Sequence, residues 1–201
     1  MNQPEKLQNL LDHLTDLLFR TWSAFLVAKN LDPIIDSNDF TQERYFLVAA
    51  HVSCVESALL GFSMLMSKKD EVNVRYLLDM CNKESSAFTR VNQANVSSEV
   101  QKHQQQLAKL EPLVQQVKMW RDKAIAHLDR KHINGPSAIA KMQPVEMEEV
   151  GEGFILLQDI INVYREWLGM GLLRLKVAES KMADEWEYLA ELIKRNDKQN
   201  Q

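Results

Sequence analysis

The chain has 201 residues, of which 45% are apolar, and its formal net charge is −4. This length supports one domain with a sizeable core, and this apolar content excludes a disordered chain. The negative balance excludes a surface that coats nucleic acid broadly, so a polyanionic ligand has to meet a local basic patch. Two cysteines, Cys54 and Cys81, are too few for a disulfide framework, and we therefore expect a reducing cytoplasm.

The first part of the chain predicts two long helices. Leucines at helical spacing predict the first helix over residues 4–30, and Pro33 lies in the connector that should follow it. The second helix, to about Ser67, is apolar almost all round, so we expect it to be central in the core. Polar residues, among them His51 and Glu56, interrupt its apolar stretch and argue against a membrane span.

The middle of the chain predicts a shorter helix over 71–82, a polar loop over 85–96 and a long helix from about Ser97. The glutamine-rich first half of this long helix contains His103, which we expect to be solvated. Pro112 either kinks the helix or begins a new one. After it, one apolar stripe consists of Leu113, Val117, Trp120, Ala124 and Leu128.

The last part of the chain predicts a loop over 130–144, followed by a long helix over 146–178 with a near-heptad apolar stripe. Gly169 and Gly171 suggest a close helix contact there. A final amphipathic helix should run from 183 to 194, with a frayed tail over 196–201. We therefore predict an all-α fold in a single domain over residues 1–201.

The most informative stretch is WRDKAIAHLDR, near the end of the helix after Pro112. Its Arg121 and His127 are six residues apart, which separates them by roughly 120° around a helix, on opposite borders of the apolar stripe. A histidine can transfer protons near neutral pH, and an arginine offers a planar, permanently charged fork for phosphate oxygens. Asp122, Lys123 and Arg130 are the polar neighbours that could support such a site.

This arrangement of an arginine, a polar residue and then a histidine resembles the signature of the HEPN superfamily. The form RDKAIAHLDR, followed by a polar loop, is most similar to the abortive-infection, AbiU-like branch. Many HEPN proteins are metal-independent ribonucleases of phage-defence and toxin–antitoxin systems. The resemblance implies an up-and-down helical bundle of the HEPN type with additional helices, and a composite site at a homodimer interface.

RNA carries its own nucleophile, the 2′-hydroxyl, so cleavage needs only a base, an acid and cations at the phosphate. One His127 cannot stand on both sides of an in-line displacement, and a two-fold dimer supplies a second copy. We therefore predict an endoribonuclease that binds RNA, acts as a homodimer and requires neither a cofactor nor a metal. An antitoxin protein is a possible further partner, and no membrane is expected.

Two departures from the family pattern leave an alternative open. Asp122 stands where the family often has asparagine, and a carboxylate beside the phosphate opposes anion binding. Asp129 stands where HEPN toxins silenced by nucleotidyltransferase antitoxins carry a tyrosine, so this silencing is not expected here. The alternative is a catalytically silent HEPN module that binds a nucleotide or a partner protein.

Three further alternatives concern single residues. Arg121 and His127 could serve only helix-dipole and packing purposes near the end of their helix. Glu56 is a candidate partner for Arg121, but the favoured alternative is that it points to solvent or pairs elsewhere. Arg44 and His51 repeat the same spacing inside an apolar helix, and we interpret this second copy as coincidence.

Overall fold

The computed structural model describes residues 3–35, 45–68, 72–124 and 145–199. Within these ranges the chain forms seven α-helices, one short 3-10 helix and no strand, which confirms the predicted all-α fold. The elements are α1 (Gln3–Ile35), α2 (Tyr45–Leu65), α3 (Val74–Lys83), η2 (Ser85–Ala87), α4 (Gln93–Lys109), α5 (Glu111–Ala124), α6 (Met147–Trp167) and α7 (Leu175–Gln199).

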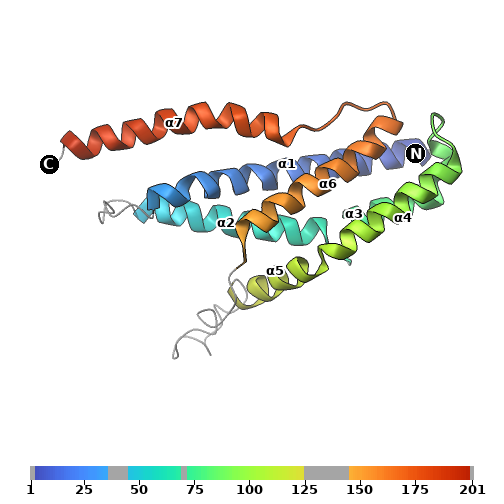
Figure 1. The fold of residues 1–201 in the computed structure, drawn as a ribbon, viewed down its shortest axis with the longest axis horizontal. Helices are drawn as coiled ribbons and strands as arrows, with labels where there is room; N and C mark the ends of the chain where they lie inside the picture. Colours follow the sequence, from blue (N-terminus) through green and yellow to red (C-terminus); the bar gives the residue numbers. More distant parts are fainter. Residues whose placement is uncertain (1–2, 36–44, 69–71, 125–144, 200–201) are drawn as a thin grey trace.

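Helix α1 organises the bundle, because α2, α3, α6 and α7 all pack against it (Figure 1). Helices α4 and α5 lie on the opposite side of α1 from α7, with α5 packed on α2 and α4 on α3. The buried positions of α1 recur at helical spacing, as predicted, and burial of each leucine contributes about 1.5–3 kcal/mol. They include Leu7, Leu10, Leu14, Leu18, Trp22, Phe25 and Leu26.

Aromatic rings from three helices meet at the centre of this core. The Phe154 ring of α6 meets the Phe62 ring of α2 edge-on, with centroids 5.3 Å apart, and lies 5.9 Å from the Phe25 ring of α1. A glycine permits the approach, because a Cβ at Gly153 would stand 2.7 Å from Phe62 Cε2. Three helices of predicted apolar character, α1, α2 and α6, therefore converge on one aromatic cluster.

Several helix boundaries differ from the predicted ones, among them those of α7, which spans Leu175–Gln199 rather than 183–194. Helix α1 continues through Pro33 to Ile35, since a proline one turn from a helix end removes only a single backbone hydrogen bond. Helix α4 begins at Gln93 rather than near Ser97, because the Asn92 side chain accepts a hydrogen bond from Ala94 N at 3.0 Å. At Pro112 the second of the two alternatives holds, and a new helix, α5, begins.

The predicted helix over 146–178 is wrong, because it is divided in two. Helix α6 ends at Trp167, and Gly169 adopts a φ of +74°, a left-handed conformation that ends helices and favours glycine. Residues 168–174 then connect α6 to α7. The apolar periodicity continues across this break, which is why periodicity alone did not reveal it.

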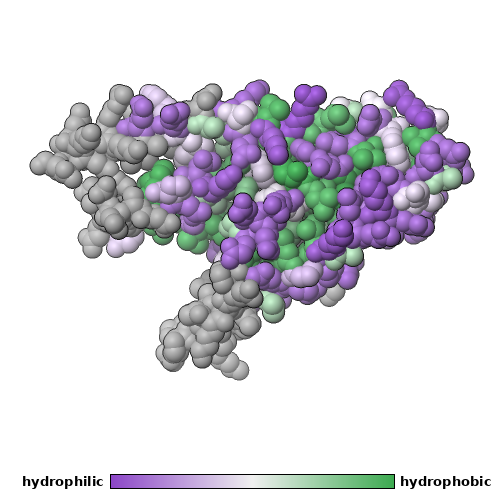
Figure 2. Space-filling view, in the orientation of Figure 1, coloured by the Kyte–Doolittle hydropathy of each residue, from purple (hydrophilic) through white to green (hydrophobic). Residues whose placement is uncertain are grey.

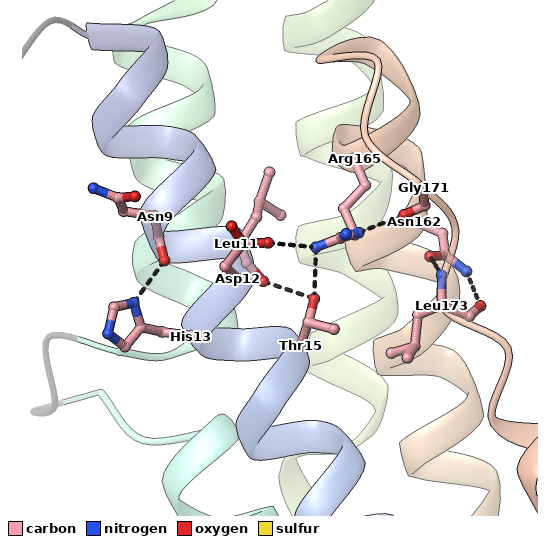
Figure 3. Close-up of polar contacts among 9 residues, drawn as sticks. All are labelled: Asn9, Leu11, Asp12, His13, Thr15, Asn162, Arg165, Gly171 and Leu173. Atoms are coloured by element: carbon pink, nitrogen blue, oxygen red, sulfur yellow. Dashed lines mark hydrogen bonds and ion pairs between the residues drawn. The ribbon is translucent and has the colours of Figure 1, made fainter.

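Polar side chains fix the α6–α7 connector to the bundle (Figure 3). The Asn162 amide donates to Leu173 O and accepts from Leu173 N, both at 2.8 Å. Arg165 donates to Gly171 O at 2.7 Å and to Asp12 Oδ1 at 3.0 Å, which joins the connector to α1. The connector is thus held at two points before α7 begins.

The prediction that the second helix is central is wrong for one of its faces. We call this face the α2 outer face; it consists of Phe46, Ala49, Ser53, Ser57, Leu60 and Met64, all exposed. Helix α2 is long and apolar enough to cross a membrane, and 28% of its most apolar 18-residue segment is buried inside the bundle. Core helices of soluble proteins can be equally long and apolar, so length and composition alone do not assign α2 a membrane role. Apolar side chains also show between polar ones on the face drawn in Figure 2.

His103 is buried rather than solvated, which corrects the prediction for this residue. Its Nδ1 lies 2.9 Å from the Tyr164 hydroxyl of α6, and its Nε2 lies 3.2 Å from Glu99 Oε1. Desolvation lowers the pKa of His103, opposed by the nearby Glu99 carboxylate and assisted by Lys102. His103 therefore joins α4 to α6 through a polar contact inside the core.

Candidate functional site

Arg121 lies on the last turns of α5, where this helix packs against α2. Val114 and Val117, seven and four residues earlier on the same side of α5, are buried, and α5 packs on α2. Its Nη1 lies 3.4 Å from Ser63 Oγ of α2. The Arg121 side chain is 36% exposed, so its guanidinium spans the junction of α2 and α5 at the surface.

Asp122 occupies the fork of the Arg121 guanidinium. Its Oδ1 accepts hydrogen bonds from Arg121 Nε at 2.9 Å and Nη2 at 2.7 Å. The Asp122 side chain is 63% exposed, and exposed ion pairs of this kind contribute roughly 0–1 kcal/mol. A phosphate could therefore replace the carboxylate at low cost, but only after Asp122 has turned away.

The remaining predicted residues of the motif are not placed by the structure. His127 and Arg130 lie outside the described residues, and the side chain of Lys123 is not described. The structure thus shows the predicted catalytic residue Arg121 with its supporting neighbour Asp122, and the role of His127 stays a prediction. Asp129 lies outside the described residues as well.

Glu56 is half-buried on α2, two helical turns before Ser63. Within the described part of the chain, the contacts of the Arg121 guanidinium are with Asp122 and Ser63 and do not include Glu56. Helix α5 runs antiparallel to α2, since Glu111 at its start pairs with Lys68 beyond the end of α2. The described end of α5 therefore points along α2 towards the turn that contains Glu56.

The second arginine–histidine pair, Arg44 and His51, differs from the pair at Arg121. Arg44 lies outside the described residues, but His51 is half-buried on α2. Its Nε2 lies 2.6 Å from Asp32 Oδ1, close to the end of α1. His51 thus joins two helices, a contact that no signal in the sequence predicts, and this role fits its interpretation as a coincidental match.

The described residues do not form a metal-binding cluster. Among the described residues, no three His, Cys, Asp or Glu side chains converge on a point that could hold a metal ion. Cys54 and Cys81 are both free thiols on different helices, and burial raises the pKa of each. Independence from metal is a prediction that activity measurements have to test.

Comparison with known proteins gives a family for this chain. The family model HEPN AbiU2 matches residues 5–189, which covers α1 to α6 and most of α7. Comparisons with curated proteins and with solved structures gave no match. The family match extends far beyond the motif and agrees with the all-α architecture. This chain therefore belongs to the AbiU2 family of HEPN proteins, a family related to abortive infection.

Proposed function

We propose that this chain is a metal-independent endoribonuclease of a phage-defence or toxin–antitoxin type system. The observation that supports this most is the Arg121 guanidinium, which is partly exposed at the α2–α5 junction and held only by Asp122 and Ser63 among the described residues. Such a group can bind two oxygens of one phosphate and stabilise the charge that develops there. RNA is the substrate because it brings its own nucleophile.

In this mechanism Arg121 binds the scissile phosphate and His127 transfers protons. One His127 accepts the proton of the 2′-hydroxyl while its oxygen forms a bond to phosphorus. The bond from phosphorus to the 5′-oxygen breaks, and the His127 of a second copy donates a proton to this leaving oxygen. The products are a 2′,3′-cyclic phosphate and a 5′-hydroxyl end.

The second copy requires an interface, and the α2 outer face is our candidate. Leu60 and Met64 are 40% and 42% exposed there, and they lie beside Ser63, the contact of Arg121. The smaller Ala49, Ser53 and Ser57 would let another helix approach closely. A two-fold contact through this face would bring two Arg121 side chains towards one groove, as a composite site requires.

The oligomeric state tests this interface. Wild-type protein should have the mass of a dimer in light scattering at micromolar concentration, and Leu60→Glu combined with Met64→Glu should be monomeric. Leu172→Glu is the matched control, since Leu172 is 51% exposed on the α6–α7 connector, and it should stay dimeric. A monomeric wild type, or wild type that floats with phosphatidylcholine vesicles, would contradict the dimer.

Activity is tested with RNA in the presence of a chelator. Wild-type protein should cleave, and His127→Ala should not, while it keeps its fold and most of its RNA affinity because proton transfer acts mainly in the transition state. His13→Ala is the control, because His13 is exposed on α1 and contacts only Asn9 O among the described residues (Figure 3). Recovery of lost activity by magnesium, or 3′-hydroxyl products, would count against the mechanism.

One observation favours the alternative, a catalytically silent module that binds a nucleotide or a partner protein. Asp122 fills the Arg121 fork through two hydrogen bonds, and this contact competes with any phosphate. Binding of a nucleotide that Arg121→Ala abolishes, without RNA cleavage by the wild type, would support this alternative.

A further inference from the structure

A groove separate from the Arg121 motif opens between α1, α6 and α7. It has a volume of about 610 Å³ and is lined by residues from the C-terminal half of α1, the first turns of α6 and the start of α7. Pockets of roughly 300–1,000 Å³ are typical for small organic ligands. We call it the α7 groove. Neither Arg121 nor any of its contacts lines it.

Aromatic rings form the floor of the α7 groove. Trp22 and Phe25 stack with centroids 5.0 Å apart, and both are almost fully buried by the surrounding helices. The Trp22 Nε1 already donates to Leu175 O at 3.2 Å, so the floor offers no free indole donor. A Cβ at Gly151 would stand 2.7 Å from Phe25 Cζ, so this glycine lets α6 pack closely against the Phe25 ring at the base of the groove. The floor therefore suits an apolar or aromatic group.

Carboxylates dominate the rim of the groove. Asp32, Glu148, Glu152 and Glu179 oppose Lys29 and Lys176, which gives four negative and two positive charges, a net of −2. Three of these groups contact charged or titratable partners: Lys29 pairs with Glu179 at 3.0 Å, and Asp32 contacts His51.

Glu148 and Glu152 are the rim carboxylates that a ligand could use. They stand one turn apart on α6, and within the described part of the chain neither has an ion pair. Two adjacent carboxylates repel each other, and a cation between them relieves this repulsion. The same pair repels anions such as nucleotides.

We propose that the α7 groove binds a small organic cation with an apolar or aromatic body. The body lies on the Trp22–Phe25 floor, and the ammonium group faces Glu148 and Glu152. The rim carboxylates attract the ammonium and the apolar floor favours the apolar body, so floor and rim favour the same ligand. This site is independent of the proposed ribonuclease activity.

The test uses tryptamine as the probe in calorimetry of the full chain at low salt, with indole-3-acetate as an anion of the same ring system. Tryptamine should bind one site per chain, and indole-3-acetate should bind at least about tenfold more weakly, a difference of about 1.4 kcal/mol. Equal binding of both probes, or no binding of tryptamine at millimolar concentration, would overturn the proposal. Binding of an arginine-rich peptide in place of tryptamine would overturn it too.

Substitutions on the rim and floor of the α7 groove test whether tryptamine binds there. Glu148→Gln and Glu152→Gln should each weaken tryptamine about two- to fivefold, and less so at high salt, because these carboxylates are exposed. Ile155→Trp should fill the groove and abolish binding. Glu166→Gln, an exposed position farther along α6, should leave binding unchanged. If Ile155→Trp keeps its helical spectrum and still binds tryptamine, the ligand lies elsewhere and the proposal fails.

Discussion

The His103–Tyr164 contact and the Arg121–Asp122 contact both involve a basic side chain beside a polar partner, but they differ in their access to water. Tyr164 is fully buried and His103 almost so, and rings of Phe88 and Trp167 close over the pair. Arg121 and Asp122 are 36% and 63% exposed. The first pair cannot exchange partners without opening the core, whereas the second can do so at the surface.

This difference separates a structural polar group from one that is available for function. A buried hydrogen bond is costly to break, because the partner left behind remains without water. An exposed ion pair is worth little, so a ligand can displace it. We therefore expect substitutions at Tyr164 to act on folding, and substitutions at Arg121 to act on RNA.

The largest effect should follow truncation of Tyr164. Tyr164→Ala should lower the free energy of unfolding by about 3–5 kcal/mol, since it leaves a cavity and an unpaired His103. Arg121→Ala should change the free energy of unfolding by less than about 0.5 kcal/mol. Urea denaturation followed by circular dichroism measures both. If Arg121→Ala unfolds the chain as Tyr164→Ala does, the Arg121 contact is structural and the comparison fails.

The next effect concerns cleavage. Arg121→Ala should reduce RNA cleavage about 100- to 1,000-fold and also weaken RNA binding, because a phosphate clamp acts before and during the reaction. Arg121→Lys should recover only part of each loss, since an ammonium lacks the planar fork. Single-turnover cleavage and filter binding separate the two quantities. Full activity in Arg121→Lys would show that only a positive charge is needed.

A smaller effect is the dependence of stability on pH. Burial lowers the pKa of His103 in the folded chain, so the unfolded chain takes up this proton first as pH falls. The contribution of neutral, buried His103 to the free energy of unfolding is complete above about pH 6.5. It is lost as pH falls from there through the lower pKa of His103 in the folded chain, by at most about 1.4 kcal/mol per pH unit.

Denaturation midpoints between pH 5 and 8 measure this slope, and His103→Gln should flatten it. The groups that face His103 are Glu99 and Lys102 on its own helix and Tyr164 on α6. His13→Ala, at an exposed histidine, serves as the control and should retain the slope. An unchanged slope in His103→Gln would place the pH dependence elsewhere.

The smallest effect is expected at Asp122. Asp122→Asn removes the carboxylate from the Arg121 fork, so RNA affinity at low salt should rise about two- to fivefold while stability hardly changes. Asp79→Asn, on the exposed side of α3, is the matched control for the loss of one negative charge. A fall in RNA affinity would instead assign Asp122 the task of orienting Arg121.

The sequence predicted most of the helices, because leucine spacing and scarce glycine act locally. It could not predict the α2 outer face, since an apolar residue looks the same whether a neighbouring helix covers it or not. His103 could have been found: it continues the buried stripe of Val96 and Val100 at spacings of four and three. Its glutamine-rich surroundings concealed this position. Of the site, the structure describes Arg121 and its contacts, while His127 remains outside the described residues.

The anchored α6–α7 connector has a mechanical consequence. Because Asn162 and Arg165 fix residues 171 and 173, α7 leaves the bundle in one set direction rather than swinging on a linker. Its 25 residues extend about 37 Å, first alongside α1 and then past the end of α1 (Figure 1). A rotation at the connector would therefore move the far end of α7 by more than its start. A fluorophore or fused domain at its far end would report small rotations at the connector as large displacements.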